Sequence, residues 1–328
     1  MKPWEESVRL LPVPLQPIHG EVLGSYLHRL AAANRMSSAR LGQCLSPHSN
    51  PFFTRRTDAL RRWTPTALPR LATMTGVPIE VLQRSLPAFV RLAARANGTG
   101  EPVHAHYDLY VVCRHCMLRH GIHEPVLAHM AEGLRLCNKH AIWLDGACHP
   151  HVGHLDGLIK AQRQHFGLVR RFPGTIDMAT KEAEKLIRSW LMTNYQPTLQ
   201  KRWQKRLVQL PRQEPRYSDV VRQRHDEWER IVTYPEFVSV LGIIADPRWR
   251  AHRIPTGRHV SVEDHREAIA VIFTEAERRL SVPTLRVMPE RRTFHNDPLF
   301  RWTDPRGRVR FPRRDEPHTV TRSPSQAG

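Results

Sequence analysis

The sequence lacks several features that mark common classes of protein. Its 328 residues contain no run of about 18 apolar residues, which a membrane-spanning helix requires. The first residues lack the apolar core of a secretory signal. Motifs for nucleotide phosphates or an activated serine (G-x-x-x-x-G-K-[ST], G-x-G-x-x-G and G-x-S-x-G) do not occur. We therefore expect a cytoplasmic protein that has no membrane partner and is not an enzyme.

Acidic residues and lysine are also scarce. The chain has 31 Asp and Glu against 50 Lys and Arg, a formal net charge of +19, and only seven of the basic residues are lysine. Codon bias can favour arginine over lysine, but it does not explain the deficit of carboxylates. The planar arginine fork suits phosphate oxygens, and a field of this sign attracts polyanions. Double-stranded DNA, or a complex assembled on it, is the expected partner.

Cysteine is infrequent, and its number is odd. Five cysteines cannot all pair, and three of them have metal-ligand spacing, which argues against a disulfide framework. Cys113 and Cys116 form a CxxC knuckle, and Cys137 and His140 form a CxxH knuckle about twenty residues later. Thiolates and imidazole suit zinc, and four protein ligands leave no position for a reactive water. We expect one structural Zn²⁺ at these four residues.

Other residues near the knuckles are alternative ligands. The fourth ligand could come from the intervening histidines: His115, His120, His123 and His129. A second site could be built on a further group: Cys148, His149, His151 and His154. These last three histidines with Asp156 are also the cluster that an HNH-type nuclease would need. We prefer His140, because it has knuckle spacing to Cys137, and we predict no catalytic residues.

Much of the remaining chain has helical patterns. A first amphipathic helix opens at Gly20, with Glu21 in its first turn, where a carboxylate suits the helix dipole. Its apolar stripe has helical spacing: Leu23, Tyr26, Leu27, Leu30 and Ala31. A short basic helix is expected over Thr54–Trp63. Further helices are expected at Leu155–Val169, Lys181–Met192, His225–Val240 and Val262–Leu280.

The segment Leu68–Leu86 has the pattern of a helix-turn-helix. Its first helix ends near Met74, and Pro78 stands at the start of the second helix, where proline is tolerated. The shared apolar seam would consist of Leu71, Val77, Val81, Leu82 and Leu86. Two short packed helices can also serve packing alone. If this region binds DNA, the expected contact residues are Arg55, Arg56, Arg61, Arg62, Gln83 and Arg84.

Together these patterns predict a mainly α fold. We expect an N-terminal helical region at 1–100 with a helix-turn-helix at about 68–86, a small zinc-ribbon module at 101–155, and a helical C-terminal region at 156–285. Proline, arginine and polar residues dominate 286–328, which is expected to be an extended or disordered tail.

The order of these motifs resembles that of the TniQ/TnsD family of transposition proteins. The shared opening is a proline-rich leader, Gly-Glu, and a helix with a Leu-x-Ser-aromatic-Leu core: Pro12, Pro14, Gly20, Glu21, Leu23, Ser25, Tyr26, Leu27, Arg29, Leu30 and Asn34. The helix-turn-helix segment and the four knuckle residues, followed by Trp143 and Leu144, match the later motifs. The resemblance covers about residues 9–155, and more weakly the helix Leu158–Arg171.

The chain departs from the family pattern at three places. Tyr26 stands where tryptophan is usual, Arg114 stands where many members have proline, and only Cys148 remains of the cysteine pairs of a second ribbon. We therefore expect one zinc and no second one.

The resemblance implies an adaptor for transposon target-site selection. Such proteins recognise DNA or dock on a targeting complex, and they recruit an AAA+ ATPase regulator of the TniB/TnsC type that engages a DDE transposase. The resemblance leaves open whether a CRISPR effector complex takes part and whether the chain is a homodimer. The alternative is a transcription regulator that binds DNA through a zinc ribbon and a helix-turn-helix.

Overall fold

The computed structural model describes residues 7–45, 66–89, 109–129, 131–146, 148–193, 196–210, 218–252, 262–282 and 297–303. The chain divides into two compact units, Met1–Gly153 and His154–Gly328. The described residues are mainly helical, which confirms the predicted fold class. Among them, no helix combines the length and the apolar character that crossing a bilayer requires.

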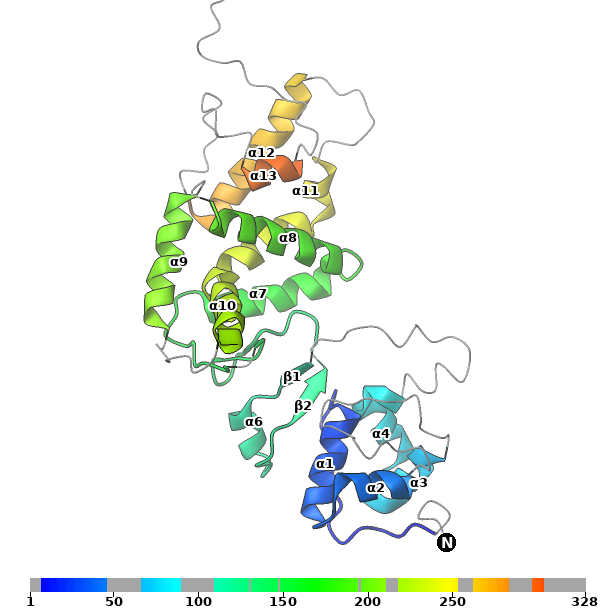
Figure 1. Cartoon of the computed structure of the whole chain (residues 1–328). Helices are drawn as coiled ribbons and strands as arrows, with labels where there is room; N and C mark the ends of the chain where they lie inside the picture. The colour runs from blue at the N-terminus through cyan, green and yellow to red at the C-terminus, as the bar shows by residue number, and fades with distance from the viewer. Residues whose placement is uncertain are drawn as a thin grey trace, which may run out of the picture. The chain divides into compact units, whose positions relative to one another are not determined.

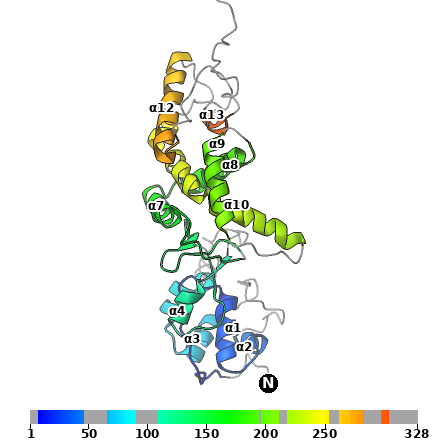
Figure 2. The same ribbon diagram turned by 90° about the vertical axis from the view of Figure 1, so that its left-hand side faces the viewer.

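The first unit begins with a group of short helices: α1 (Leu23–Ala33), α2 (Ser38–Leu45), α3 (Ala67–Thr75) and α4 (Ile79–Ser85). Each contacts the next, and Figure 2 shows them gathered together. Their shared core includes Tyr26, Leu30, Leu41, Leu71 and Leu82. The predicted apolar stripe of α1 is confirmed, because all five of its residues are buried.

The segment 68–86 forms two helices joined by a tight turn. Gly76 ends α3 with a φ of +66°, in the left-handed region that favours glycine. Pro78 caps α4, as its position in the sequence predicted. Four residues of the predicted seam are buried, and Val81 is half-buried. The helical pair therefore exists, and its apolar seam is part of the core of the first unit.

Two small antiparallel sheets also belong to the first unit. β1 (Leu109–Val111) pairs with β2 (Leu127–His129), and β3 (Leu136–Cys137) pairs with β4 (Ile142–Trp143). The short helix α6 (Arg114–Leu118) follows β1 (Figure 1). Strands of two or three residues are too short for an alternating pattern, so the sequence did not predict them.

The second unit is built around a long helix, α10 (Ser218–Ile244). The helices that contact it are α7 (Leu158–Arg171), α8 (Ile176–Leu191), α9 (Pro197–Gln209), α11 (Pro247–Ala251) and α12 (Val262–Leu280). Figure 1 shows α10 surrounded by α7, α8 and α9. Buried Trp190, Trp203 and Ile272 contribute large side chains to its core.

Several predicted boundaries differ from the structure. The predicted range for α12 is confirmed, but α7, α8 and α10 begin or end several residues away from the predicted ranges. The helix expected at Thr54–Trp63 lies outside the described residues.

The expectation of an extended tail at 286–328 is wrong for part of that range. Pro298–Thr303 form a helix, α13, which contacts α8 and α12. Leu299, Phe300 and Trp302 are buried there. These three apolar residues pack the short helix against the second unit, which the mostly polar composition of the range 286–328 does not indicate.

Candidate metal centre

The first pair of predicted ligands follows strand β1. The Val112 N–H donates to Val126 O at 2.8 Å, which continues the β1–β2 pairing as far as the first cysteine. Cys113 then caps α6, and Cys116 lies within this short helix. The chain therefore turns tightly between the two thiols, as a CxxC knuckle requires.

The second pair lies in the β3–β4 hairpin. Cys137 ends β3, and His140 lies in the turn before β4. Ala141 has a φ of +50°, so the hairpin turn closes through a left-handed residue. Leu136 and Trp143 face each other across the hairpin and are buried. The hairpin therefore fixes the spacing of the CxxH knuckle.

The two knuckles meet. The His140 Nδ1 atom lies 3.5 Å from Cys113 Sγ, 3.3 Å from Cys116 Sγ and 3.7 Å from Cys137 Sγ. The sulfurs of Cys116 and Cys137 are 3.7 Å apart, and all four ligand atoms lie within 4.8 Å of one another. These four residues, selected from sequence spacing, form a cluster that can hold a metal ion.

Without a cation, the cluster favours protonated thiols and a neutral imidazole. Burial raises the pKa of Cys113, and burial together with the neighbouring Cys137 thiol raises the pKa of Cys116 to about 12. Desolvation and the nearby His115 lower the pKa of His140, which favours the neutral imidazole that binds metals. Several thiols in one place resist ionisation, and a divalent cation removes that resistance.

The alternative ligands are not part of this cluster. His115 lies beside it, with its ring centroid 5.4 Å from that of His140, but the group that can hold a metal contains His140 and none of the intervening histidines. Within the described ranges, no second group forms at Cys148, His149, His151 and His154. His154 Nε2 instead lies 3.0 Å from Gln209 O.

Glu21 has a different role from the one expected. Helix α1 begins at Leu23, so Glu21 precedes the helix instead of lying in its first turn. Its carboxylate is buried and accepts hydrogen bonds from Arg29 Nε at 2.9 Å and Arg29 Nη2 at 2.7 Å, and from Ser25 Oγ at 3.0 Å. The spacing of four residues between Glu21, Ser25 and Arg29 is the signal that could have revealed this contact, because it places them on one side of a helix.

The opening segment is joined to both neighbouring motifs. Val22 N donates to Leu127 O at 2.9 Å, and Leu127 N donates to Ser25 Oγ at 3.0 Å. Gly20 accepts from His129 N at 2.9 Å and donates to Ser85 O at 2.8 Å. Strand β2 and the end of α4 therefore share backbone hydrogen bonds with the segment that leads into α1.

The proline-rich leader is held by side chains of helix α1 and by Asn34, the residue that caps the C-terminal end of α1. Tyr26 Oη donates to Leu15 O at 2.7 Å, and Arg29 Nη2 donates to Gln16 O at 3.3 Å. The Asn34 side chain donates to Val13 O and accepts from Val13 N, both at 2.9 Å. The polar residues of the opening motif thus hold the leader against the helix.

The residues predicted to bind DNA are divided. Arg55, Arg56, Arg61 and Arg62 lie outside the described residues. Gln83 is half-buried and Arg84 is exposed on α4, where Arg84 Nε donates to Glu80 O at 3.2 Å.

Comparison of the chain with known protein families, with characterised proteins and with solved structures finds no match.

Proposed function

We propose that Cys113, Cys116, Cys137 and His140 bind one structural Zn²⁺. Tetrahedral zinc, with Zn–S bonds of about 2.3 Å and Zn–N bonds of about 2.1 Å, separates two sulfurs by about 3.8 Å and a sulfur from a nitrogen by about 3.6 Å. The Cys116–Cys137 distance of 3.7 Å and the distances of 3.3 to 3.7 Å from the sulfurs to His140 Nδ1 fit this geometry. Four protein ligands leave no open position, which supports a structural role.

We further infer that the protein is a cytoplasmic, DNA-associated adaptor for transposon target-site selection. The supporting observation is the set of hydrogen bonds that joins the three motifs of the TniQ/TnsD resemblance. Gly20 and Val22, in the opening motif, bond to Ser85 at the end of α4 and to β2 of the metal-bearing module. These contacts support the proposal because they bring the three motifs together in one folded unit.

In this proposal the protein is not an enzyme. It binds double-stranded DNA and recruits an AAA+ ATPase regulator of the TniB/TnsC type, which engages a DDE transposase. The family-like first unit contacts the ATPase, which is the constant partner. The second unit contacts what varies, either the target DNA or a targeting complex. A transcription regulator, the alternative, has no ATPase partner.

The test is a pull-down with the AAA+ protein encoded beside this gene, in the presence of ATP. Zinc-loaded Met1–Gly153 is expected to retain the ATPase, and His154–Gly328 is not. Retention by His154–Gly328 alone would show that the division of roles is wrong. If neither fragment nor the whole chain retains the ATPase, the adaptor proposal fails and the transcription regulator replaces it.

A further inference from the structure

Three helices of the second unit meet around Gly242, which lies inside α10. A Cβ atom built on this glycine would collide with Arg279 Nη1 of α12 and would lie 3.5 Å from the methyl groups of Leu168 of α7. Glycine is unfavourable inside a helix. Here the missing side chain leaves the space that the Arg279 guanidinium occupies, so α10 admits a charged group close to its backbone.

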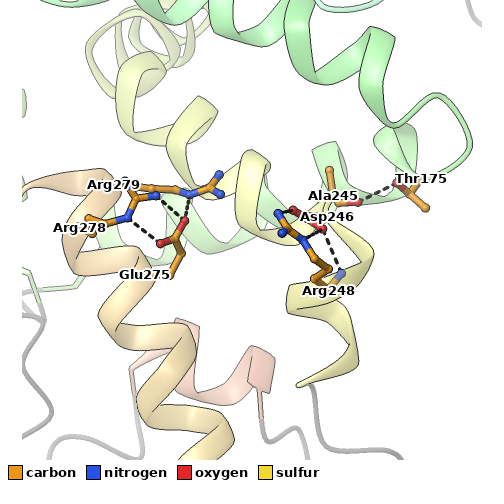
Figure 3. Close-up of polar contacts among 7 residues, drawn as sticks. All are labelled: Thr175, Ala245, Asp246, Arg248, Glu275, Arg278 and Arg279. Carbon is orange, nitrogen blue, oxygen red and sulfur yellow. Dashed lines mark hydrogen bonds and ion pairs between the residues drawn. The ribbon is translucent and has the colours of Figure 1, made fainter.

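Arg279 shares a buried carboxylate with its neighbour on α12. Glu275 accepts two hydrogen bonds from Arg278, from Nε at 2.8 Å and from Nη2 at 2.7 Å, and a third from Arg279 Nε (Figure 3). The Glu275 side chain is only 10% exposed, whereas that of Arg278 is 68% exposed. The carboxylate therefore orients a guanidinium that faces solvent.

The same arrangement occurs where α10 meets α11. Asp246 accepts from Arg248 Nε at 3.3 Å and from Arg248 Nη2 at 3.0 Å, with side chains 5% and 73% exposed respectively. Thr175 Oγ1 donates to Ala245 O at 3.0 Å, which fixes the turn after α7 beside this junction (Figure 3). A second solvent-facing guanidinium is thus oriented by a buried carboxylate.

The two carboxylates and their arginines act on one another. The hydrogen bond from Arg248, with a smaller contribution from Arg171, lowers the pKa of Asp246. Asp246, and to a lesser degree Glu275, raise the pKa of Arg248. We call Arg171, Arg248, Arg278 and Arg279 the arginine cluster. Three of its cations are paired with the two buried carboxylates, and Arg171 acts on Asp246 without a hydrogen bond, so the cluster carries a surplus of positive charge.

We propose that the arginine cluster binds the phosphate backbone of double-stranded DNA. Arg248 and Arg278 each use two of five N–H donors on a carboxylate, and the described residues supply no partner for the others. Because the carboxylates already hold these side chains, little freedom is lost when a phosphate binds. The net charge of +19 attracts polyanions, and duplex DNA has a dense, regular row of phosphates that an acidic protein surface lacks. This inference rests on the proposed association with DNA, and it adds a contact surface on the second unit.

The test uses the full-length, zinc-loaded protein and a short duplex DNA of random sequence. Binding is measured by fluorescence anisotropy over a range of salt concentrations. The double variant Arg248→Gln/Arg278→Gln removes two charges but keeps an N–H for each carboxylate. Each neutralised phosphate contributes about 0.9 to the logarithmic salt slope, so the slope should fall by about two and affinity at about 0.1 M salt should fall more than tenfold. The matched control is Arg163→Gln/Arg188→Gln, two exposed arginines on α7 and α8, which should change the slope far less.

A second variant keeps the test decisive if the double variant does not fold. Arg171→Gln removes an exposed cation and leaves both carboxylate pairs intact, and the slope should fall by about one. If both cluster variants bind as the control does, the proposal is wrong. It is also wrong if the double variant keeps its DNA affinity but no longer retains the ATPase, since the cluster would then bind protein. If the wild-type chain binds no duplex at low salt, the proposed DNA association itself fails, which is a separate outcome.

Discussion

The described helices at the start of the first unit have 7 to 11 residues and its strands have two or three, whereas α10 of the second unit has 27. Short elements bury little apolar surface each. In the first unit, a four-residue ligand cluster and the buried Glu21–Arg29 ion pair add polar links between these elements. In the second unit, large buried side chains such as Trp190 and Trp203 join long helices. Both units have an apolar core and buried ion pairs, such as Arg206–Glu236 in the second unit, but among the described residues only the first unit holds a cluster that can bind a metal. We therefore expect the first unit to depend on a bound ion and the second to fold without one.

Loss of the metal should reveal the clearest difference in stability between the two units. Cys137→Ser is expected to unfold the β3–β4 hairpin and loosen the first unit, because zinc binding contributes on the order of 10 kcal/mol to the folding of isolated zinc fingers. Limited proteolysis with mass spectrometry should show new cleavage within Met1–Gly153 and a protected second unit. Cys44→Ser, outside the cluster, is the control. New cleavage in both units, or in neither, would contradict the comparison.

The buried ion pair should give the next largest effect. Glu21→Gln leaves the Arg29 charge buried without its counter-ion, and such a loss costs about 3–5 kcal/mol. Hydrogen exchange should show faster exchange in α1 and β2 and no change in α10. Glu80→Gln, at an exposed carboxylate on α4, should stay within about 0.5 kcal/mol of wild type. If the two variants are equally mild, the ion pair does not support the first unit.

A hydrogen bond in the second unit should have a smaller effect, confined to that unit. Trp190 Nε1 donates to the buried Asp297 carboxylate, at 3.2 Å to Oδ1 and 3.3 Å to Oδ2. Trp190→Phe removes this donor and should lower the free energy of unfolding by about 1–3 kcal/mol, measured by urea denaturation. Trp249→Phe is the control for loss of an indole N–H, because the described residues offer no partner to Trp249 Nε1, although Trp249 is half-buried and Trp190 fully buried. Equal effects of the two variants would show that this hydrogen bond is unimportant.

The smallest expected effect is a pH dependence of the second unit. Arg248 lowers the pKa of Asp246, and Arg278 followed by Arg279 lowers that of Glu275, so these two carboxyl groups bind fewer protons in the folded unit than in the unfolded chain. Their contribution is therefore fully present above the ordinary carboxyl pKa of about 4, and it is lost as pH falls through the lowered values. Asp246→Asn should flatten the acid loss of stability in urea titrations. The effect is modest because solvent screens the exposed Arg248. If Asp246→Asn loses stability with falling pH in the same way as the wild type, this prediction is wrong.

The cluster of four candidate metal ligands could be predicted from the sequence because its pattern is local. Each knuckle joins two ligands three residues apart, and only one further step, the meeting of the two knuckles, depends on the tertiary fold. Helix α1 was predictable for a similar reason, since its stripe from Leu23 to Ala31 repeats at helical spacing. Both the knuckle spacing and the apolar stripe are patterns among residues that lie close together in the sequence.

Contacts between distant residues were not predictable in the same way. Ser25 Oγ accepts from Leu127 N of β2, about a hundred residues later, and no local pattern indicates that contact. Helix α9 buries only Leu199 and Trp203, too few for a clear stripe. Helix α13 is short and is stabilised by packing against α8 and α12, which a local pattern cannot show.

Native mass spectrometry of the full-length protein tests the central claim most directly. The account predicts one zinc ion per wild-type chain, its loss in Cys137→Ser, and its retention in Cys148→Ser. A second ion that disappears in Cys148→Ser would show that another site exists near that cysteine. A folded wild-type chain that carries no zinc, even after purification with added zinc, would contradict the claim that this metal holds the first unit together.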